Sequence, residues 1–315
     1  MLNRRHLRVK VLQALYAYFQ SNDPNYVKLE ENLMKSIEKI YLLYLYFLLS
    51  FEEIKDQAEH RLEESKKKFR PTEEDSNPNM KLINNRLFAL LEQHKELKRE
   101  ANTHKASWEG AENQELFRKI FLVIRESETF FAYMNNGEDS FEDDLAFTVE
   151  LFKEEIANSE VLYNHLEELD IHWIDDIDLV CSMVVRTIKG FTEKEQNILP
   201  LYKDEKDEVS FVKELFRKTI KLNDESETLI DDLTMNWELD RIAKMDVLLM
   251  KMAITELQVF PNIPTKVTLN EYIEISKFYS TPKSHAFING ILDKAISKLT
   301  TDKKIKKSGR GLMNE

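Results

Sequence analysis

The scarcity of glycine is the feature that most constrains the fold. The chain has 315 residues and only 6 glycines, where average usage of about 7% would give roughly 22. Apart from Gly309 and Gly311, no two glycines lie closer than nineteen positions, so the sequence holds no glycine-rich loop of the kind that cradles phosphates. The turns of a many-stranded sandwich or barrel also need residues that tolerate positive φ. We therefore expect an all-α protein of long helices joined by short polar connections.

The charge of the chain limits where a nucleic acid could bind. The formal net charge is −12, and binding to a polyanion needs clustered lysines and arginines, so any such site must be local. Between Glu138 and Asp178 there are 15 acidic residues and one lysine, Lys153. This stretch is interpreted either as a solvated helix face or as a surface that repels RNA or docks a basic protein.

Cysteine content and hydropathy indicate the cellular setting. The single cysteine, Cys181, excludes an internal disulfide and a cysteine-built zinc site, and its apolar neighbours predict a buried, inert thiol. The longest apolar run, Ile40 to Phe51, is shorter than the roughly 20 residues that span a bilayer, so it predicts a buried helix and no membrane span. The N-terminal segment has no signal-peptide cleavage site. We expect a cytoplasmic protein.

Helical periodicity and polar breaks divide the chain into four parts. Residues 1–24 hold a first helix at 3–20, residues 25–200 form a long helical region, residues 201–300 form a compact core, and residues 301–315 form a basic tail that we expect to be disordered. Within the long region, helical patterns cover 28–69 as a pair or a single helix, 81–106 and 115–133.

The compact core carries several local signals. Asp246 is a plausible N-cap, Thr268 with Glu271 predicts a capping box that starts a helix at about Leu269, and Ser284 can cap the final helix. A helical glycine costs about 1 kcal/mol relative to alanine. Gly290 therefore predicts the close approach of another helix.

The first helix has a cationic end. Its apolar stripe runs through Leu12, Leu15 and Phe19, and the same stripe extended towards the N-terminus reaches Arg8 and Arg5. Arginines cannot lie unpaired in an apolar core, so we expect this end, with Arg4, to project towards water or a partner. Because helix N-termini favour anions, a phosphate backbone would suit the site. The alternative is an ordinary basic N-terminus that pairs with the acidic middle region.

A second group of candidates lies around the start of the last helix. Phe287, beside Lys283, could stack on an unpaired base, a contact worth about 1–3 kcal/mol, and Asn289 could reach backbone or base edges. Taken alone, Phe287 is better interpreted as a core residue.

The sequence does not predict chemistry at a metal or a catalytic site. The acidic stretch contains His165, Glu168, Asp170 and His172, but a dinuclear helical site needs paired Glu-x-x-His units from several helices, and only fragments occur. No nucleophile–base set or paired-carboxylate cleft stands out. We expect no cofactor, no metal and no enzymatic activity.

Several segments of the last third together resemble the NusB family of transcription antitermination factors. They are Trp237-Glu-Leu-Asp-Arg-Ile-Ala-Lys-Met-Asp246, Leu248-Leu-Met-Lys-Met-Ala-Ile-Thr-Glu256-Leu257, Ile263-Pro264-Thr-Lys266-Val267, Asn270-Glu271, Ile273-Glu274 and Phe287-Ile-Asn-Gly-Ile-Leu-Asp293-Lys294. The opening Arg4-Arg5-His-Leu-Arg8-Val-Lys-Val-Leu-Gln13-Ala14-Leu15-Tyr16 is similar to the arginine-rich first helix of that family. The two parts cover a quarter to a third of the chain.

The resemblance implies a helical bundle that binds the single-stranded boxA element of nascent ribosomal RNA transcripts. It also implies a heterodimer with NusE, a small-subunit ribosomal protein, in a complex with NusA, NusG and RNA polymerase. Carried over by position, Arg5 and Arg8 would contact phosphates or bases, and Phe287 with Asn289 would belong to the RNA surface.

Two departures from the family pattern leave alternatives open. Ala286 stands where the family often has a basic residue, and Pro282 with Lys283 replaces a more acidic loop. The middle region, about 25–200, has no counterpart in compact family members, and we expect Glu142 to Asp178 to face away from the arginine helix. The alternative function is a helical interaction scaffold that has lost RNA binding. RNA methyltransferases that carry a similar helical domain need a glycine-loop domain downstream, which this sequence lacks.

Overall fold

Every regular element of the structure is helical. The structure is a computed structural model that describes residues 2–21, 24–70, 72–234 and 242–308, and no strand occurs within these ranges. The all-α prediction is therefore confirmed. Among the described residues, no helix combines the length and apolar character needed to cross a membrane. The segment from Trp237 to Arg241, which contributes to the family resemblance, lies outside the described residues.

The chain divides into two compact units. The first unit consists of residues 1–37 and 202–315, and the second of residues 38–201. The chain thus leaves the first unit after residue 37 and returns to it at Tyr202. Residues 25–37, which the sequence analysis assigned to the long middle region, are part of the first unit.

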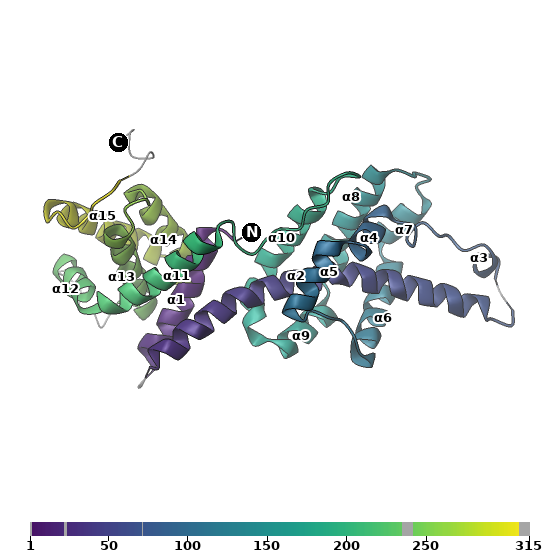
Figure 1. The fold of residues 1–315 in the computed structure, drawn as a ribbon, viewed down its shortest axis with the longest axis horizontal. Coiled ribbons are helices and arrows are strands. Elements are labelled where there is room, and N and C mark those ends of the chain that lie inside the picture. Colours follow the sequence, from purple (N-terminus) through teal and green to yellow (C-terminus); the bar gives the residue numbers. More distant parts are fainter. Residues whose placement is uncertain (1, 22–23, 71, 235–241, 309–315) are drawn as a thin grey trace. The chain divides into compact units, whose positions relative to one another are not determined.

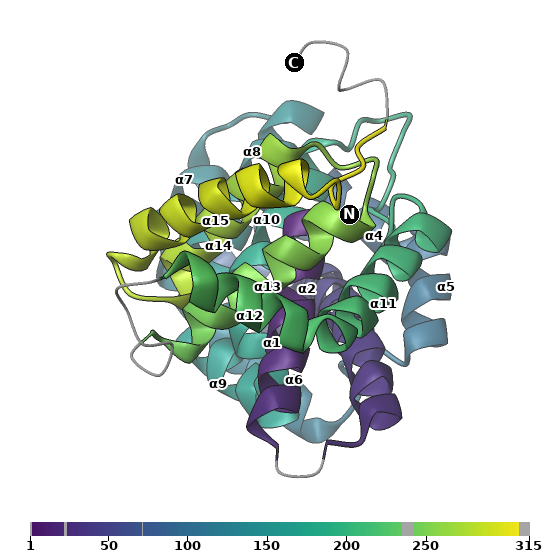
Figure 2. The same cartoon turned by 90° about the vertical axis from the view of Figure 1, so that its left-hand side faces the viewer.

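The first unit is a bundle around one buried helix. Its helices are α1 (Arg4–Gln20), the beginning of α2 (Tyr26–Lys66), α11 (Glu205–Lys221), α12 (Asn223–Leu233), α13 (Lys244–Val259), α14 (Thr265–Tyr279) and α15 (Ser284–Thr301) (Figure 1). Helix α13 packs against α1, α11, α12, α14 and α15, and Figure 2 shows these helices grouped about it. Every residue from Leu248 to Leu257 is buried, as expected of a helix surrounded by others.

Contacts at the two ends of α13 give the helix directions. Arg8, near the start of α1, contacts Glu256 near the end of α13, whereas Gln20, at the end of α1, contacts Lys244. Helix α1 is therefore antiparallel to α13. The hydroxyl of Ser284, the first residue of α15, donates to Asp246 at 2.6 Å, so α15 begins beside the start of α13.

The predicted caps of the core helices are wrong. Helix α13 begins at Lys244, and Asp246 lies inside its first turn, where it accepts hydrogen bonds from Ser280 and Ser284. Helix α14 begins at Thr265, directly after Pro264, so Thr268 is an interior residue. Long-range partners thus take the side chains that the local pattern assigned to helix ends.

Two further predictions for the first unit are also corrected. A Cβ atom added at Gly290 would meet no heavy atom within 4 Å, so no helix approaches closely there. The described part of the tail, residues 302–308, contacts the bundle. Lys307 donates from Nζ to the Phe260 carbonyl at 2.9 Å, and the Ser308 amide donates to the Pro261 carbonyl at 3.0 Å.

The second unit consists of shorter helices around the remainder of α2. They are α3 (Glu73–Ser76), α4 (Arg86–Glu92), α5 (Lys95–His104), α6 (Ala111–Glu126), α7 (Glu128–Asn135), α8 (Phe141–Leu151), the π-helix η1 (Phe152–Ile156), α9 (Glu160–Leu169), the 3-10 helix η2 (Ile171–Asp176) and α10 (Ile177–Lys189) (Figure 1). The single-helix alternative for 28–69 is confirmed by α2. The run Ile40 to Phe51 is largely buried, as predicted.

Two predicted helices of the second unit are each broken in the middle. The pattern over 81–106 forms α4 and α5, because the ring of His94 accepts from the Leu97 amide at 3.0 Å and caps a new helix. The pattern over 115–133 forms parts of α6 and α7, separated at Ser127, whose hydroxyl accepts from the Phe130 amide.

Candidate functional site

Arg8 is held in a buried ion pair in the first unit. Its Nε and Nη2 atoms donate to the two carboxylate oxygens of Glu256, each at 2.7 Å. The side chains of Arg8 and Glu256 are 2% and 0% exposed. The prediction that Arg8 projects towards water is therefore wrong. A charged side chain can be buried when a bidentate partner supplies opposite charge and hydrogen bonds.

Neighbouring polar groups complete this pair. The Thr268 hydroxyl donates to Glu256 at 2.8 Å and the Tyr272 hydroxyl donates to it at 3.2 Å. The guanidinium carbon of Arg8 lies 5.4 Å from the ring centre of Phe211. Burial alone would lower the pKa of Arg8, but the hydrogen bond and charge of Glu256 outweigh it and raise that pKa. The pair and its hydroxyl donors join α1 to α13 and α14.

Arg5 lies nearer the surface and also has an acidic partner. Its Nε and Nη2 donate to the carboxylate of Glu271 at 2.9 and 2.8 Å, and its side chain is 40% exposed. The hydrogen bond from Arg5 lowers the pKa of the Glu271 carboxyl, although partial burial opposes this shift. A guanidinium has five N–H groups. The two bonds to Glu271 thus leave donors of Arg5 for another ligand.

Arg4 completes the cationic end of α1. Its Nη2 lies 2.5 Å from Asp207 of α11, and its guanidinium carbon lies 5.0 Å from the ring centre of Phe211. The alternative that the arginines pair with the acidic middle region is wrong for their described contacts. Their partners, Asp207, Glu256 and Glu271, all belong to the first unit.

An open cavity lies beside the arginines. Its volume is about 410 Å³, and its lining joins the first turns of α1 to the segment that connects α13 with α14. The lining residues are Asn3, Arg4, Arg5, Arg8, Asn262, Ile263, Pro264, Val267 and Glu271. The cavity therefore combines three arginines, two amides and a single carboxylate, groups that suit a phosphate and its sugar, with three apolar residues, Ile263, Pro264 and Val267.

The tail brings further cations to the same end of the bundle, which the sequence analysis missed. Lys307 is bonded to the Phe260 carbonyl, and Ser308 to Pro261, one residue before the cavity lining begins at Asn262. Lys303 and Lys306 are exposed. The lysine-rich composition was the available signal, but it gave no indication of where the tail docks.

The candidates on α15 do not join the arginines. Ser284 binds Asp246, whereas Arg8 binds Glu256, and ten residues of α13 separate these partners. That separation is about 15 Å along a helix axis. Lys283, which directly precedes Ser284, therefore lies at the opposite end of α13, and Phe287 and Asn289 follow in the next turns of α15.

The exposure of the α15 candidates differs from residue to residue. Lys283 is exposed, and Phe287 and Asn289 are half-buried. The side-chain amide of Asn289 donates to Asp293 at 3.4 Å. The half-buried state of Phe287 therefore does not decide between the two interpretations, a core residue and a stacking platform.

Cys181 of the second unit is consistent with an inert thiol. It is a free cysteine that is half-buried rather than fully buried. Burial raises its pKa to about 12, with the charge of Asp178 adding to the shift. The thiolate needed for nucleophilic chemistry is therefore suppressed near neutral pH.

Comparison with known proteins finds similarity over residues 176–297 of the chain. Residues 176–297 match the sequence model of the NusB family, so the resemblance is confirmed there. The chain is 44% identical over 103 residues to the transcription antitermination protein NusB of Salinibacter ruber, covering 33% of this chain and 64% of that protein. It is 40% identical over 104 residues to the transcription antitermination protein NusB of Chloroherpeton thalassium, covering 33% of this chain and 49% of that protein.

A third relative gives similar coverage. The transcription antitermination protein NusB of Natranaerobius thermophilus is 41% identical over 70 residues, which are 22% of this chain and 50% of that protein. The chain thus spans between about half and just under two thirds of the length of these curated relatives. No solved structure matches the chain. The NusB-like residues include α10 to α15.

Proposed function

We propose that this protein is an RNA-binding transcription antitermination factor that acts on boxA of nascent ribosomal RNA transcripts. The observation that carries the proposal is the cationic cavity at the start of α1, in a bundle whose last helices match the NusB family. In this proposal the first unit, together with α10, is the NusB-like part, and the rest of the second unit is an insertion.

The proposed RNA surface begins at the cavity. Arg4 and Arg5 are partly exposed and line it, so they would contact phosphates of a single strand. Lys303 and Lys306 would extend the cationic surface along the tail. Arg8 has a different role in this proposal, because its bidentate bond with Glu256 holds it inside the bundle. It would position α1 rather than touch RNA.

Lys283, Phe287 and Asn289 would serve a second part of the same RNA. The start of α15, beside Lys283, lies about 15 Å from the arginine end, measured along α13, so one strand of several nucleotides would have to cross the bundle to reach both groups. Phe287 would supply a stacking contact there and Asn289 a hydrogen bond.

We further propose that the protein works with NusE, RNA polymerase, NusA and NusG. The NusE surface would use the helices α11 to α15, since these are the NusB-like part of the bundle. Helix α14 presents the apolar side chains of Val267 and Phe278 to solvent, which are 44% and 81% exposed. The proposal extends to these helices and not to individual residues that would contact NusE.

One observation favours the scaffold alternative. Arg4, Arg5 and Arg8 all have carboxylate partners within the bundle, so a phosphate would have to compete with Asp207 and Glu271 for the two exposed arginines. If that competition fails, the bundle would retain its protein partners and lack RNA binding.

A titration of boxA-containing RNA across salt concentrations, with and without NusE, tests the proposal. For single strands the slope of log K against log salt is about −0.7 per phosphate contact, so Arg5→Gln should reduce the slope by about 0.7. Arg118→Gln is the matched control, because Arg118 is likewise exposed and paired with a glutamate, but belongs to the second unit. It should leave the slope unchanged.

Three outcomes separate the candidate functions. A salt-dependent RNA complex that weakens with Arg5→Gln supports the RNA-binding proposal. A complex with NusE and no RNA shift at any salt concentration supports the scaffold. An RNA complex with a flat salt response, or one that is indifferent to Arg4 and Arg5, overturns the proposed surface.

A further inference from the structure

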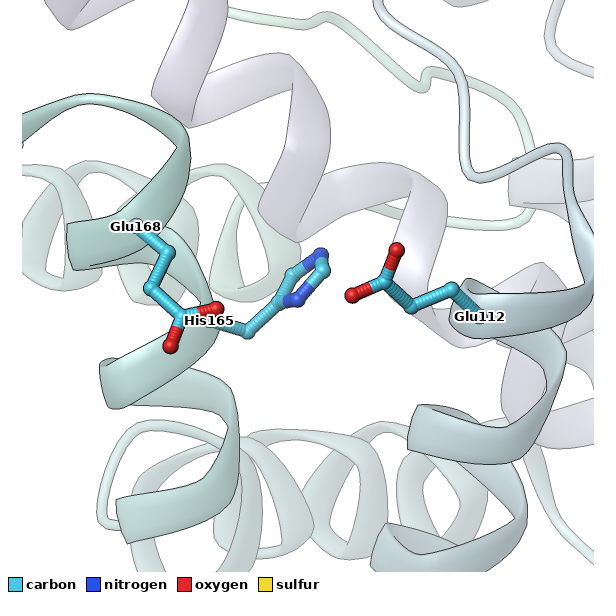
Figure 3. Close-up of side chains that lie close together, drawn as sticks. All are labelled: Glu112, His165 and Glu168. Carbon is cyan, nitrogen blue, oxygen red and sulfur yellow. The ribbon is translucent and has the colours of Figure 1, made fainter.

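Three side chains that can bind metal meet on one face of the second unit. Figure 3 shows His165 between Glu112 and Glu168. One ligand atom from each residue can be chosen so that all three atoms lie within 4.8 Å of one another. Glu112 lies in the first turn of α6, and His165 and Glu168 lie on α9.

The spacing of residues on α9 and the packing of α6 against α9 bring the three residues together. His165 and Glu168 are three positions apart on α9, so they share a helix face. Helices α6 and α9 pack against each other, which places Glu112 across from that face. The sequence analysis found only a fragment because Glu112 is 53 residues from His165 in the chain.

The sequence fragments that do not join the cluster have other partners. The Asp170 carboxylate pairs with Lys39 at 2.7 Å and accepts from the His172 amide at 3.1 Å. Asp170 thereby caps η2. The set that the structure assembles is therefore different from the set that the sequence pattern indicated.

The imidazole of His165 has an unmet bonding capacity. Its Nε2 atom is buried and has no hydrogen-bond partner among the described residues. An unpaired buried polar atom carries a desolvation cost, so a ligand at the ring would be favourable. The many carboxylates between Glu138 and Asp178, in the same unit, raise the local concentration of cations.

We propose that Glu112, His165 and Glu168 bind a divalent transition-metal ion, with zinc as the best fit. Imidazole with carboxylates suits zinc, whereas magnesium and calcium prefer all-oxygen sites. Three protein ligands leave a fourth position of a tetrahedral site for water. Bonds of about 2.0–2.2 Å hold tetrahedral ligand atoms about 3.4 Å apart.

Closing the site needs only side-chain motion. The offered atoms must approach by at most about 1.4 Å, and the exposed Glu112 and Glu168 can make this adjustment by rotation about their χ angles. The bound ion would then join α6 to α9 and stabilise the second unit.

Isothermal titration of the full-length, chelator-treated protein with zinc chloride tests the site. We expect one ion per chain. Glu112→Gln and Glu168→Gln should each weaken binding at least about tenfold. Glu167→Gln is the matched control, because Glu167 is an exposed neighbour on α9 that lies outside the cluster, and it should bind zinc like the unaltered protein. Excess magnesium should not compete.

Tryptophan fluorescence provides a second readout at the site. The ring centres of Trp108 and His165 are 6.0 Å apart, so cobalt at the cluster should quench Trp108, and Trp108→Phe should remove most of the quenching. The absence of saturable zinc binding in the unaltered protein would overturn the proposal. Equal binding by the unaltered protein and the E112Q/E168Q double variant would also overturn it.

Discussion

Arg8 and Glu256 show how a single pair of residues can have two opposite effects on the bundle. Taking both charges out of water is costly, and the bidentate bond with its two hydroxyl donors offsets that cost. The pair therefore contributes little net stability compared with an apolar pair. Replacing only one of the two residues, however, leaves the charge of the other buried without a partner.

Glu256→Gln should destabilise the protein by about 3–5 kcal/mol, because the Arg8 charge loses its buried counter-ion. Glu271→Gln, which breaks the more exposed pair with Arg5, should cost about 0–1 kcal/mol. Urea unfolding measures both. The double variant Arg8→Met with Glu256→Leu should recover much of the loss, and equal small losses in both single variants would contradict this account.

His6 should make the stability of the first unit depend on pH. Burial, followed by the charge of Arg5, lowers its pKa to about 4. The folded state therefore binds this proton less readily than the unfolded chain, whose histidine pKa is about 6.5. The contribution of His6 is fully present above pH 6.5 and is lost as the pH falls through about 4.

The variant His6→Gln keeps an acceptor for the Asn3 amide and removes the titration. Urea unfolding at pH 7 and pH 5 should show a smaller loss of stability in this variant than in the unaltered protein. An equal loss in the two proteins would show that His6 does not carry the effect.

At the scale of elements, the sequence predicts the existence of helices better than their ends. The apolar period identified α2 as a helix over 28–69. It did not identify the starts of α13 and α14, because Asp246 and Thr268 have cap-forming side chains that bind Ser284 and Glu256 instead. A local pattern cannot distinguish a cap from a residue with a distant partner.

Ser127 separates two helices that the apolar pattern joined. Its hydroxyl accepts from the Phe130 amide at 3.2 Å at the start of α7 and donates to the Ile124 carbonyl at 2.8 Å at the end of α6. Ser127→Ala should cost about 1 kcal/mol by thermal or urea unfolding. Ser182→Ala is the control, because the Ser182 hydroxyl bonds to the Asp178 carbonyl inside α10 and caps no helix. Equal effects of the two substitutions would contradict the capping role.

At the scale of the whole molecule, the sequence indicated that the long middle region is a separate part of the chain. It did not predict how the helices of this region pack. Its acidic composition marked it, and the family match covers only its end, from residue 176, whereas its core depends on pairings that no local pattern shows. Trp173, for example, donates to the Lys39 carbonyl across 134 positions. For the candidate site, the sequence identified the arginines and missed their partners for the same reason.

A destabilising substitution in one unit should increase unfolding of that unit and leave the other folded, because each unit has its own core. In Glu256→Gln, amide hydrogen exchange should accelerate in peptides from α1, α13 and α14. Peptides from α4 to α8 should keep their protection. A uniform loss across both sets would show that the units unfold as one.

Because α1 is the first helix of the chain, it is synthesised long before the residues of α13 that it packs against. Glu256 follows Arg8 by 248 residues, which a ribosome adding about 5–20 residues per second takes about 12 to 50 s to make. The second unit is complete at residue 201, so it can fold during this interval. The buried apolar residues of α1, among them Leu7, Val11 and Leu15, meanwhile lack α13 and α14, two of the helices that α1 packs against. A nascent chain of this protein therefore depends on whatever shields its first twenty residues until the last third emerges.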